Sequence, residues 1–487
     1  MEEDDLFNEE RLKTLQSIID ANVNPYPYRF DRTHNVDQIL SKYEGHGTDP
    51  SEEKVRIAGR LTGKRGHGKV LFCDITDLSG SMQIFVRFNN LGEERFRFFA
   101  DHLEVGDILG VWGPVFCTKK GELSVWVEGF ELLAKSLSEL PEKFHGLQNV
   151  EKRYRQRYLD LISNPNVREI FKKRARVIQS IRSTMLGRGF MEVETPILQP
   201  IYGGANARPF TTHHHFLNKD LFLRIAPELY LKRLVVGGFE RVFEIGRNFR
   251  NEDIDTQHNP EFTMMECYEA YADYNDVMDL TEELIVNAAR DITGGDRVEF
   301  SGKEIDLARP WKRLSMEDAV REACGVDLSN TLEEMRSAGE EKGVRDLEDV
   351  STKGEMLAAL FEELVESTLI APTFITDYPV EVSPLAKAHR DREGLTERFE
   401  LFMNGWEMAN GFSELNDPKD QLQRFKGQDR RRLEGDAEAQ MIDLDYVKAL
   451  SQGMPPAGGL GVGIDRLVMI LTDNTSIKEV LLFPQMR

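Results

Sequence analysis

The sequence predicts an α+β protein with two main parts: a small β-barrel near the N-terminus and a larger domain built on an antiparallel β-sheet flanked by helices. Two observations support this fold class. Short β-type runs follow one another between residues 54 and 137, and two later hairpin patterns alternate with segments of helical periodicity. A chain of 487 residues is also too long for one core, so two or three domains are expected.

Charge narrows the classes of partner. The chain carries 62 basic and 84 acidic residues, and its net charge of −22 would repel a nucleic acid at long range. Phosphate contacts need only nearby cations, and two basic clusters are present: "GKRGHGK" at 63–69, and Lys152, Arg153, Arg155 and Arg157. Each cluster is either a nucleic-acid contact or a solvated surface.

The N-terminal segment and the cysteines bear on location and metal binding. The segment "MEEDDLFNEE" lacks the pattern of a secretory signal, and the sequence has no run of about 18 apolar residues. The four cysteines have no CxxC spacing, which favours neither a disulfide framework nor a zinc site. We therefore expect a cytoplasmic protein with free thiols and no membrane partner.

Residues 1–53 are expected to form a helical extension, because two of their segments have helical spacing. The barrel at 54–137 reads as three strands, a helix and two further strands with glycines at the bends, which is the order of an OB-fold. Such barrels bind single-stranded nucleic acid on an aromatic and basic face. Phe72 and Gln83 lie on the second and third strands, although Phe72 could equally be a core residue.

Residues 138–158 are expected to link the barrel to the larger domain, which spans 159–487. That domain begins with a long helix whose apolar stripe could be core or a dimer contact, and it continues into a short strand in "GFMEVETPIL". Helix-like segments within about 310–395 are expected to form an insertion in a domain otherwise rich in strands.

The first hairpin pattern, at 241–268, carries unusual polar residues. A period of two places Phe262, Glu266 and Tyr268 on one face of its second strand. A buried carboxylate needs a partner, so this face fits the floor of a pocket for a planar and a cationic group better than it fits a core. Arg250 ends the first strand, where its guanidinium could bind a phosphate or carboxylate through two bonds.

The second hairpin pattern lies at 398–415, where Asn404 and Gly405 form a strong type I′ turn signal. The resulting register pairs Phe402 with Glu407, and it predicts that Glu400 and Glu407 share a face as diagonal neighbours. Two carboxylates so close require a cation, and Mg²⁺ with ATP phosphates is the natural candidate. Regular alternation would turn Asn410, Phe412 and Glu414 away from Glu407, and a β-bulge at Gly411 would restore them to the pocket.

A glycine-rich strand is predicted near the C-terminus. Gly459, Gly461 and Gly463 alternate, so one face of this strand is free of side chains and a flat ligand can lie against it. Arg466 follows at the start of a helix, where its guanidinium could stack on a base and reach a phosphate. The spacing is not that of GxGxxG, which argues against a dinucleotide-binding fold.

The segments "GFMEVETPIL", "FRNEDIDTQHNPEFTMMECY" and "GLGVGIDRL" resemble the three signature motifs of class II aminoacyl-tRNA synthetases. "RFELFMNGWEMANGFSELNDP" resembles the lysyl-tRNA synthetases in particular, and the resemblance covers nearly the whole chain. It implies a class II antiparallel catalytic sheet. It further implies an enzyme that activates L-lysine with ATP as lysyl-adenylate, transfers lysine to the 3′ end of tRNA(Lys), uses Mg²⁺, and works as a cytoplasmic homodimer.

The resemblance also implies roles for individual residues. Arg250 and Arg466 are the implied catalytic cations, and Glu400 and Glu407 are the implied Mg²⁺ ligands. Three binding sets are implied: for ATP, Arg250, Glu252, His258, Phe262 and Arg466; for lysine, Gly204, Glu228, Glu266, Tyr268, Asn410, Phe412 and Glu414; for the anticodon, Arg65, Phe72 and Gln83. Glu414 is expected to select the lysine side chain, because a buried carboxylate rejects neutral analogues.

Two residues of the implied ATP loop depart from the family pattern: Asp253 stands where glycine is usual, and Gln257 where arginine is common. Three alternative functions stay open. A paralogue that lysylates a protein, such as the elongation factor P ligase, lacks the barrel and has serine in place of Ala226. An aspartate or asparagine synthetase is disfavoured by Glu414 and Tyr268, and a non-enzymatic RNA-binding scaffold is disfavoured by the intact catalytic residues.

Overall fold

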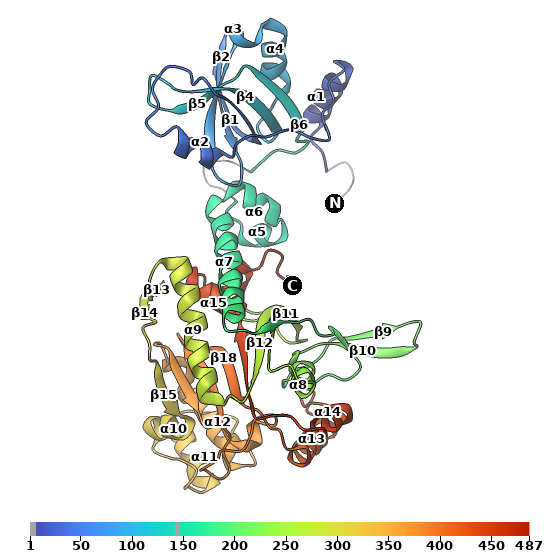
Figure 1. Cartoon of the computed structure of the whole chain (residues 1–487), viewed down its shortest axis with the longest axis vertical. Helices are drawn as coiled ribbons and strands as arrows, with labels where there is room; N and C mark the ends of the chain where they lie inside the picture. Colours follow the sequence, from blue (N-terminus) through green and yellow to red (C-terminus); the bar gives the residue numbers. More distant parts are fainter. Residues whose placement is uncertain (1–5, 142–146, 487) are drawn as a thin grey trace. The chain divides into compact units, whose positions relative to one another are not determined.

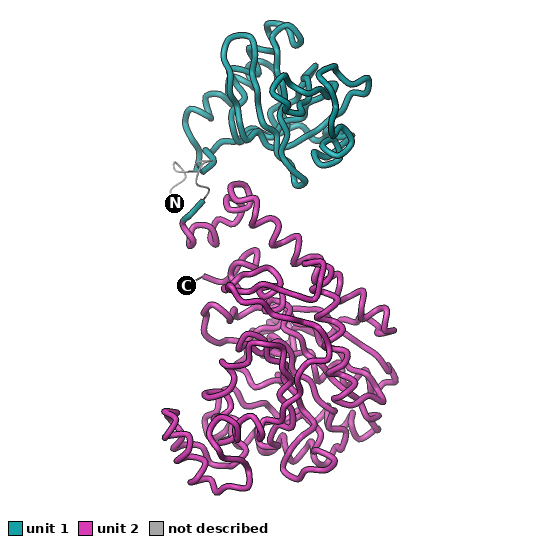
Figure 2. Tube along the Cα trace, turned by 90° about the vertical axis from the view of Figure 1, so that its left-hand side faces the viewer, with its two compact units in different colours: residues 1–148 teal, residues 149–487 magenta. Residues whose placement is uncertain are grey.

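The computed structural model describes residues 6–141 and 147–486. The chain divides into two compact units, residues 1–148 and 149–487, coloured teal and magenta in Figure 2. Each unit has a hydrophobic core of its own. Among the described residues, the structure contains no helix that is long and apolar enough to cross a membrane.

The first unit is a six-stranded β-barrel preceded by helices α1 (Glu9–Asp20) and α2 (Val36–Lys42). Its further elements are β1 (Lys54–His67), β2 (Val70–Thr76), β3 (Ser81–Arg87), α3 (Phe88–Leu91), α4 (Glu93–His102), β4 (Ile108–Cys117), β5 (Leu123–Trp126) and β6 (Gly129–Ala134). The barrel closes because β1 pairs with both β2 and β4, and β5 bridges β3 and β4. The single last strand that we predicted was wrong: Val127 and Glu128 interrupt it, so β5 and β6 pair with different neighbours.

Residues of β2 alternate between the inside and the outside of the barrel. Leu71, Cys73 and Ile75 are buried in the barrel core. Phe72 and Asp74 are only partly buried and face outward. Phe72 is therefore not part of the core, which removes one of its two alternatives.

The second unit is built on an eight-stranded sheet with the order β15-β16-β17-β18-β19-β12-β11-β7 (Figure 1). Its strands are β7 (Met191–Glu192), β11 (Arg241–Phe249), β12 (Glu261–Ala270), β15 (Lys312–Ser315), β16 (Thr373–Thr376), β17 (Arg398–Met403), β18 (Trp406–Ser413) and β19 (Ala457–Gly463). Neighbouring strands are antiparallel except at the two edges, where β15–β16 and β7–β11 are parallel. The glycine-rich β19 lies between the two predicted hairpins.

Two long helices cover one face of this sheet. α7 (Pro165–Gly187) and α9 (Tyr274–Thr293) pack together, and α9 contacts β18 and β19 (Figure 1). Val177, Ile181 and Met185 of the predicted α7 stripe are buried in the main core. This part of the stripe is therefore core and not a free surface.

Between β15 and β16, three helices form a separate core: α10 (Met316–Cys324), α11 (Leu332–Glu341) and α12 (Lys353–Leu364). The inserted part is narrower than 310–395, since β15 and β16 belong to the main sheet. The other elements of the unit are α5 (Val150–Arg155), α6 (Arg157–Ser163), β8 (Leu198–Gln199), β9 (Thr211–His214), β10 (Lys219–Leu223), α8 (Glu228–Val236), β13 (Arg297–Phe300), β14 (Lys303–Asp306), η2 (Glu366–Thr368), η3 (Val380–Val382), α13 (Pro418–Leu433), α14 (Leu444–Leu450), α15 (Ile464–Leu471) and α16 (Ile477–Val480).

The second basic cluster is folded into α5 and α6. Arg157 is fully buried, and its guanidinium donates to Asp160 at 2.5 Å and to the carbonyl of Lys478 at 2.7 Å. Arg153 donates to Asp160 and to Glu479, each at 2.9 Å. Both arginines therefore stabilise the fold of this unit. They are neither a nucleic-acid contact nor a solvated surface, the two alternatives given for the cluster.

Candidate active site

Two adjoining cavities lie along the centre of the large sheet. The first, with a volume of about 130 Å³, is lined by the β11–β12 loop, β12, β18 and the start of α15. The second, of about 280 Å³, is lined by β12, β17, β18, β19 and the start of α8. Both cavities include Arg250, Met264, Glu407, Asn410 and Gly461. One ligand with two chemically different parts can therefore span them.

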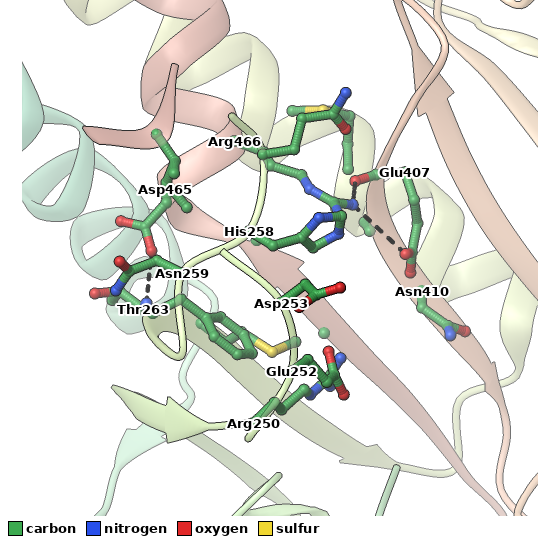
Figure 3. Close-up of a pocket in the computed structure, with 18 residues that line it drawn as sticks. Arg250, Glu252, Asp253, His258, Asn259, Thr263, Glu407, Asn410, Asp465 and Arg466 are labelled. Carbon is green, nitrogen blue, oxygen red and sulfur yellow. Dashed lines mark hydrogen bonds and ion pairs between the residues drawn. The ribbon is translucent and has the colours of Figure 1, made fainter. Parts of the chain in front are cut away.

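The loop of the first cavity is folded around Asp255. Its Oδ1 accepts the N–H groups of Gln257 at 2.6 Å and His258 at 2.7 Å, and its Oδ2 lies 2.8 Å from Nδ1 of His258. Burial raises the pKa of Asp255, but these hydrogen bonds outweigh it and the net pKa is lowered. With Nδ1 protonated toward the carboxylate, Nε2 of His258 accepts from Arg466 at 3.1 Å. Figure 3 shows His258 and Arg466 together, with Asp253 on the same loop.

Phe262 lies near the start of β12 with part of its ring exposed. The guanidinium of Arg250 is 5.1 Å from the centre of that ring. Arg466 instead donates to the backbone carbonyl of Glu407 at 2.6 Å. The family resemblance also implies that the adenine ring lies between Phe262 and Arg466. This stays a prediction, because Arg250 is the cation on the Phe262 ring in this structure. The α15 end that carries Arg466 is anchored by its neighbour Asp465, which accepts the N–H of Thr263 at 2.7 Å (Figure 3).

The register of β17 and β18 differs from the expected one after the turn. Phe402 pairs with Glu407 as predicted, but the bulge lies at Met408 and not at Gly411. Glu400 consequently pairs with Asn410. The prediction of a bulge at Gly411 was wrong because this glycine serves a close approach: an added Cβ would lie 2.6 Å from the Phe399 ring and 2.7 Å from a backbone oxygen of β19.

Glu400 and Glu407 both line the second cavity. Glu400 accepts from Tyr378 at 2.8 Å and from Arg398 at 2.5 Å, while 41% of the Glu407 side chain is exposed. Burial raises the pKa of Glu400 to about 7; Arg398 opposes this shift and Glu407 adds to it. A cation between the two carboxylates would remove the penalty for ionising both.

Mg²⁺ commonly takes one or two protein carboxylates and completes its shell with phosphate oxygens and water. The donor set of Glu400, Glu407 and the amide of Asn410 fits that pattern. Among the described residues, no group of three or more His, Cys, Asp or Glu side chains is placed to hold a metal by itself. The residues present therefore suit a metal that arrives with a phosphate ligand.

The second cavity contains all seven residues that we assigned to lysine: Gly204, Glu228, Glu266, Tyr268, Asn410, Phe412 and Glu414. Glu228, Glu266 and Glu414 are buried. Burial, followed by the charge of Glu228, raises the pKa of Glu266 to about 8, and Tyr268 donates to Glu266 at 3.3 Å. Buried carboxylates that face a cavity favour a cationic ligand, because a cation offsets their loss of hydration.

Glu414 is not the unpaired carboxylate that we expected. Its Oε2 forms an ion pair with Nζ of Lys232, a fully buried residue of α8. Nζ of Lys232 also lies 2.5 Å from Oε1 of Glu228. Oε1 of Glu414 lies over Gly459, where a Cβ would be only 1.9 Å from it. The absence of a side chain at Gly459 therefore makes room for the Glu414 side chain, whereas we had predicted that a flat ligand would lie against this face of the strand.

The outer face of the barrel brings together the three residues assigned to the anticodon. Phe72 is the cross-strand partner of Arg65 and of Phe85, and its ring lies 5.1 Å from that of Phe85. Arg65 donates to both carboxylate oxygens of Asp74, at 2.9 and 3.0 Å. Gln83 is buried, and its Oε1 accepts from Ser124 at 3.0 Å, which leaves its NH₂ group oriented as a donor.

Residues 149–487 match the family model of class II tRNA synthetases (D, K and N). The chain belongs to the class II tRNA synthetases. Residues 55–133 match an OB-fold nucleic acid binding domain. The chain is 58% identical to a lysine–tRNA ligase of Methanoculleus marisnigri over 99% of this chain and 95% of that protein. It is 55% identical to a lysine–tRNA ligase of Carboxydothermus hydrogenoformans over 98% and 97%, respectively.

This family confirms the predicted fold class, an OB-fold barrel followed by a class II synthetase sheet flanked by helices, and the predicted enzyme class. The chain is thus an ATP-dependent aminoacyl-tRNA ligase. A class II tRNA synthetase must bring together two substrates, a nucleotide and an amino acid. Arg250 lies at the junction of the two cavities.

Sequence reasoning missed three residues of this synthetase that bind to residues lining the cavities. Lys232 follows Glu228 by four residues on a helix, and Arg398 precedes Glu400 by two on a strand. Either spacing places the cation beside the carboxylate, so both could have been found from periodicity. Asp255 had no such signal, because its hydrogen bonds depend on the loop conformation.

Proposed function

We propose that the chain is a lysine–tRNA ligase that activates L-lysine with ATP to lysyl-adenylate and transfers lysine to the 3′ end of tRNA(Lys). The observation that carries the substrate assignment is the acidic cavity, in which Glu228, Glu266 and Glu414 are buried together. These acids would repel a carboxylate side chain, and an amide side chain has no positive charge to neutralise them, which disfavours an aspartate or asparagine substrate. The printed names of the relatives support the same assignment.

In the first step, an oxygen of the lysine carboxylate attacks the α-phosphorus of ATP, and the bond from this phosphorus to the bridging oxygen of pyrophosphate breaks. Such a reaction needs little covalent help, so positioning and neutralisation of charge supply most of the catalysis. Arg250 lies where both substrates meet and is proposed to bind the α-phosphate and the carboxylate. Arg466 and His258 are proposed to meet the outer phosphates, and Glu252 the adenine.

Glu400 and Glu407 are proposed to hold Mg²⁺ together with the phosphates of ATP. When bound, the metal supplies positive charge to the phosphate oxygens. Within the protein, Arg398 and Tyr378 hold the Glu400 carboxylate toward the cavity. Their hydrogen bonds orient Glu400 before any ligand arrives.

In the second step, a hydroxyl of the terminal ribose of the tRNA attacks the lysyl carbonyl carbon, and AMP leaves. The OB-fold barrel is proposed to bind the anticodon through Arg65, Phe72 and Gln83, with Phe72 stacking on a base.

We also propose that the protein acts as a cytoplasmic homodimer. The domains are proposed as a helical extension, a barrel, a linker and a catalytic domain with a helical insertion.

The deciding experiment is ATP–pyrophosphate exchange with each amino acid in turn. Exchange that depends on lysine is the expected result. Exchange with aspartate or asparagine in place of lysine would refute the substrate assignment. Lysine-dependent exchange together with transfer of lysine only to a protein, and not to tRNA, would favour the protein-lysylating paralogue.

A further inference from the structure

A buried ammonium group already lies behind the wall of the second cavity, where lysine is proposed to bind. Lys232 has no exposed side-chain surface, and its Nζ pairs with both Glu228 and Glu414. This Nζ also lies 5.1 Å from the centre of the Phe412 ring and 5.8 Å from that of Tyr268. All four of these contacts are residues proposed to surround the substrate, so a lysine of the protein shares them with a lysine that enters.

Several charged and titratable groups face this ion pair. They are Glu228 of α8, Glu266 and Tyr268 of β12, Tyr446 of α14 and Arg398 of β17. A further cavity, which Glu414 also lines, adds Asp273, Lys387, Arg390 and Glu397. Arg390 is paired with Asp273 and Glu397, and Lys387 donates to Asn416 at 2.8 Å. Lys232 is therefore the cation recorded in direct contact with Glu414 among the described residues.

The charges around the proposed lysine-binding part of the cavity can be counted, leaving aside Arg250, Arg398, Glu400 and Glu407, which also line it. With Glu228, Glu266 and Glu414 ionised, the buried carboxylates carry three negative charges, and Lys232 neutralises one. Two negative charges remain. Free lysine carries two ammonium groups, one at its α-carbon and one at the end of its side chain, while its carboxylate is proposed to bind Arg250.

We propose that Lys232 is a positioning and specificity-determining residue, the resident counter-ion that fixes Glu228 and Glu414 and leaves two carboxylate charges for the two ammonium groups of the substrate. The inference rests on the proposed lysine specificity. It gives Lys232 a role in substrate selection without contact to the reacting atoms.

The protonation of Glu414 supplies a readout. Burial raises the pKa of Glu414, and the charge and hydrogen bond of Lys232 oppose this rise. The net pKa of Glu414 is raised even with Lys232 present, and removal of Lys232 should raise it further, so that the protonated carboxyl extends to higher pH. Lysine binding would then require Glu414 to release a proton, so affinity for lysine should increase with pH more steeply than in the wild type.

The test compares wild type, Lys232→Met and Lys232→Arg by lysine-dependent ATP–pyrophosphate exchange between pH 6.5 and 9. For Lys232→Met we expect a KM for lysine at least ten-fold higher at pH 7 that recovers as pH rises, with the KM for ATP within two-fold of wild type. Calorimetry in buffers of different ionisation enthalpy should detect about one more proton released on lysine binding than in the wild type. Lys232→Arg keeps the charge and should keep the wild-type slope.

A Lys232→Met profile parallel to that of the wild type, with no additional proton released, would overturn the inference while leaving the proposed function intact. Wild-type exchange with another amino acid in place of lysine would overturn both. If Lys232→Met fails to fold, Lys232→Gln provides a second neutral variant. In the wild type, NMR should record a slowly exchanging signal from the ammonium group of Lys232, which can be assigned because it is lost in Lys232→Arg. This signal should persist when unlabelled lysine binds. Disappearance of the signal on lysine binding would also refute the inference.

Discussion

Gly459 and Glu414 lie so close together that a Cβ added to the glycine would be 1.9 Å from Oε1 of the glutamate. The same Cβ would lie 2.6 Å from the Tyr268 ring. The backbone of β19 therefore forms part of the wall behind the proposed substrate side chain. Glu414 can occupy its position only because residue 459 has no side chain.

We expect Gly459→Ala to displace Glu414 and Tyr268 and so to raise the KM for lysine by about 100-fold or more, equivalent to about 3 kcal/mol. The binding of ATP should be largely unchanged, because Gly459 lines the second cavity and not the first. Lysine-dependent exchange and ATP titration measure the two effects separately.

Gly463→Ala is the matched control on the same strand. Its added Cβ would approach no atom closer than 3.8 Å, so the KM for lysine should stay within two-fold of wild type. An equal loss of lysine affinity in both variants would mean that the strand as a whole, and not the contact at Glu414, is responsible.

Glu266 should make lysine binding dependent on pH. Its pKa is raised to about 8, mainly by burial, so the carboxyl is mostly protonated at pH 7. Its proposed ligand, the α-ammonium group, requires the ionised form, so affinity should rise as pH rises through the pKa. We expect the KM for lysine to fall by up to about ten-fold between pH 7 and 8.5.

Glu266→Gln tests this assignment, since an amide does not titrate. Its KM for lysine should be high and nearly constant over the same range, whereas the ATP dependence should follow the wild type. A variant that retains the wild-type pH profile would assign the titration to another group.

Arg157 should matter for stability and not for tRNA binding, although it lies in a basic cluster of the sequence. Its guanidinium is buried against Asp160. Arg157→Ala would leave a buried carboxylate with fewer partners, and we expect it to lower the free energy of unfolding by about 3 kcal/mol. Arg155→Ala, which removes a more exposed ion pair with Glu151, should change the free energy of unfolding by less than about 0.5 kcal/mol. Urea unfolding measures both, and selective loss of tRNA affinity in Arg157→Ala would contradict the structural role.

The sequence was sufficient for the features that depend on period and turn chemistry. Strand alternation placed Phe262, Glu266 and Tyr268 on the cavity side of β12, and the Asn404–Gly405 signal gave the correct turn and the Phe402–Glu407 pair. Both hairpins have a buried face, so a shift by one residue would expose their apolar side chains.

The remainder depends on packing between elements that are distant in the sequence. Periodicity does not distinguish a bulge at Met408 from one at Gly411. In the structure Gly411 pairs in register with Phe399 and lies close to its ring. The pairing of Lys232 with Glu414 joins α8 to the end of β18 across 182 residues of sequence (414 − 232). Local periodicity carries no information about such a contact.

Phe72 should contribute to tRNA charging without contributing to lysine activation. Its ring lies outside the barrel core, on a face with Arg65 and Gln83. Loss of one base stack costs about 1–3 kcal/mol, so Phe72→Ala should lower kcat/KM for tRNA by about 10- to 100-fold and leave pyrophosphate exchange unchanged. Leu71→Ala, in the core beside it, should instead destabilise the barrel by about 2–5 kcal/mol. Phe72→Tyr keeps an aromatic ring and should retain tRNA charging. If Phe72→Tyr loses as much kcat/KM for tRNA as Phe72→Ala, while pyrophosphate exchange and the free energy of unfolding stay normal, stacking on a base is not the role of this ring.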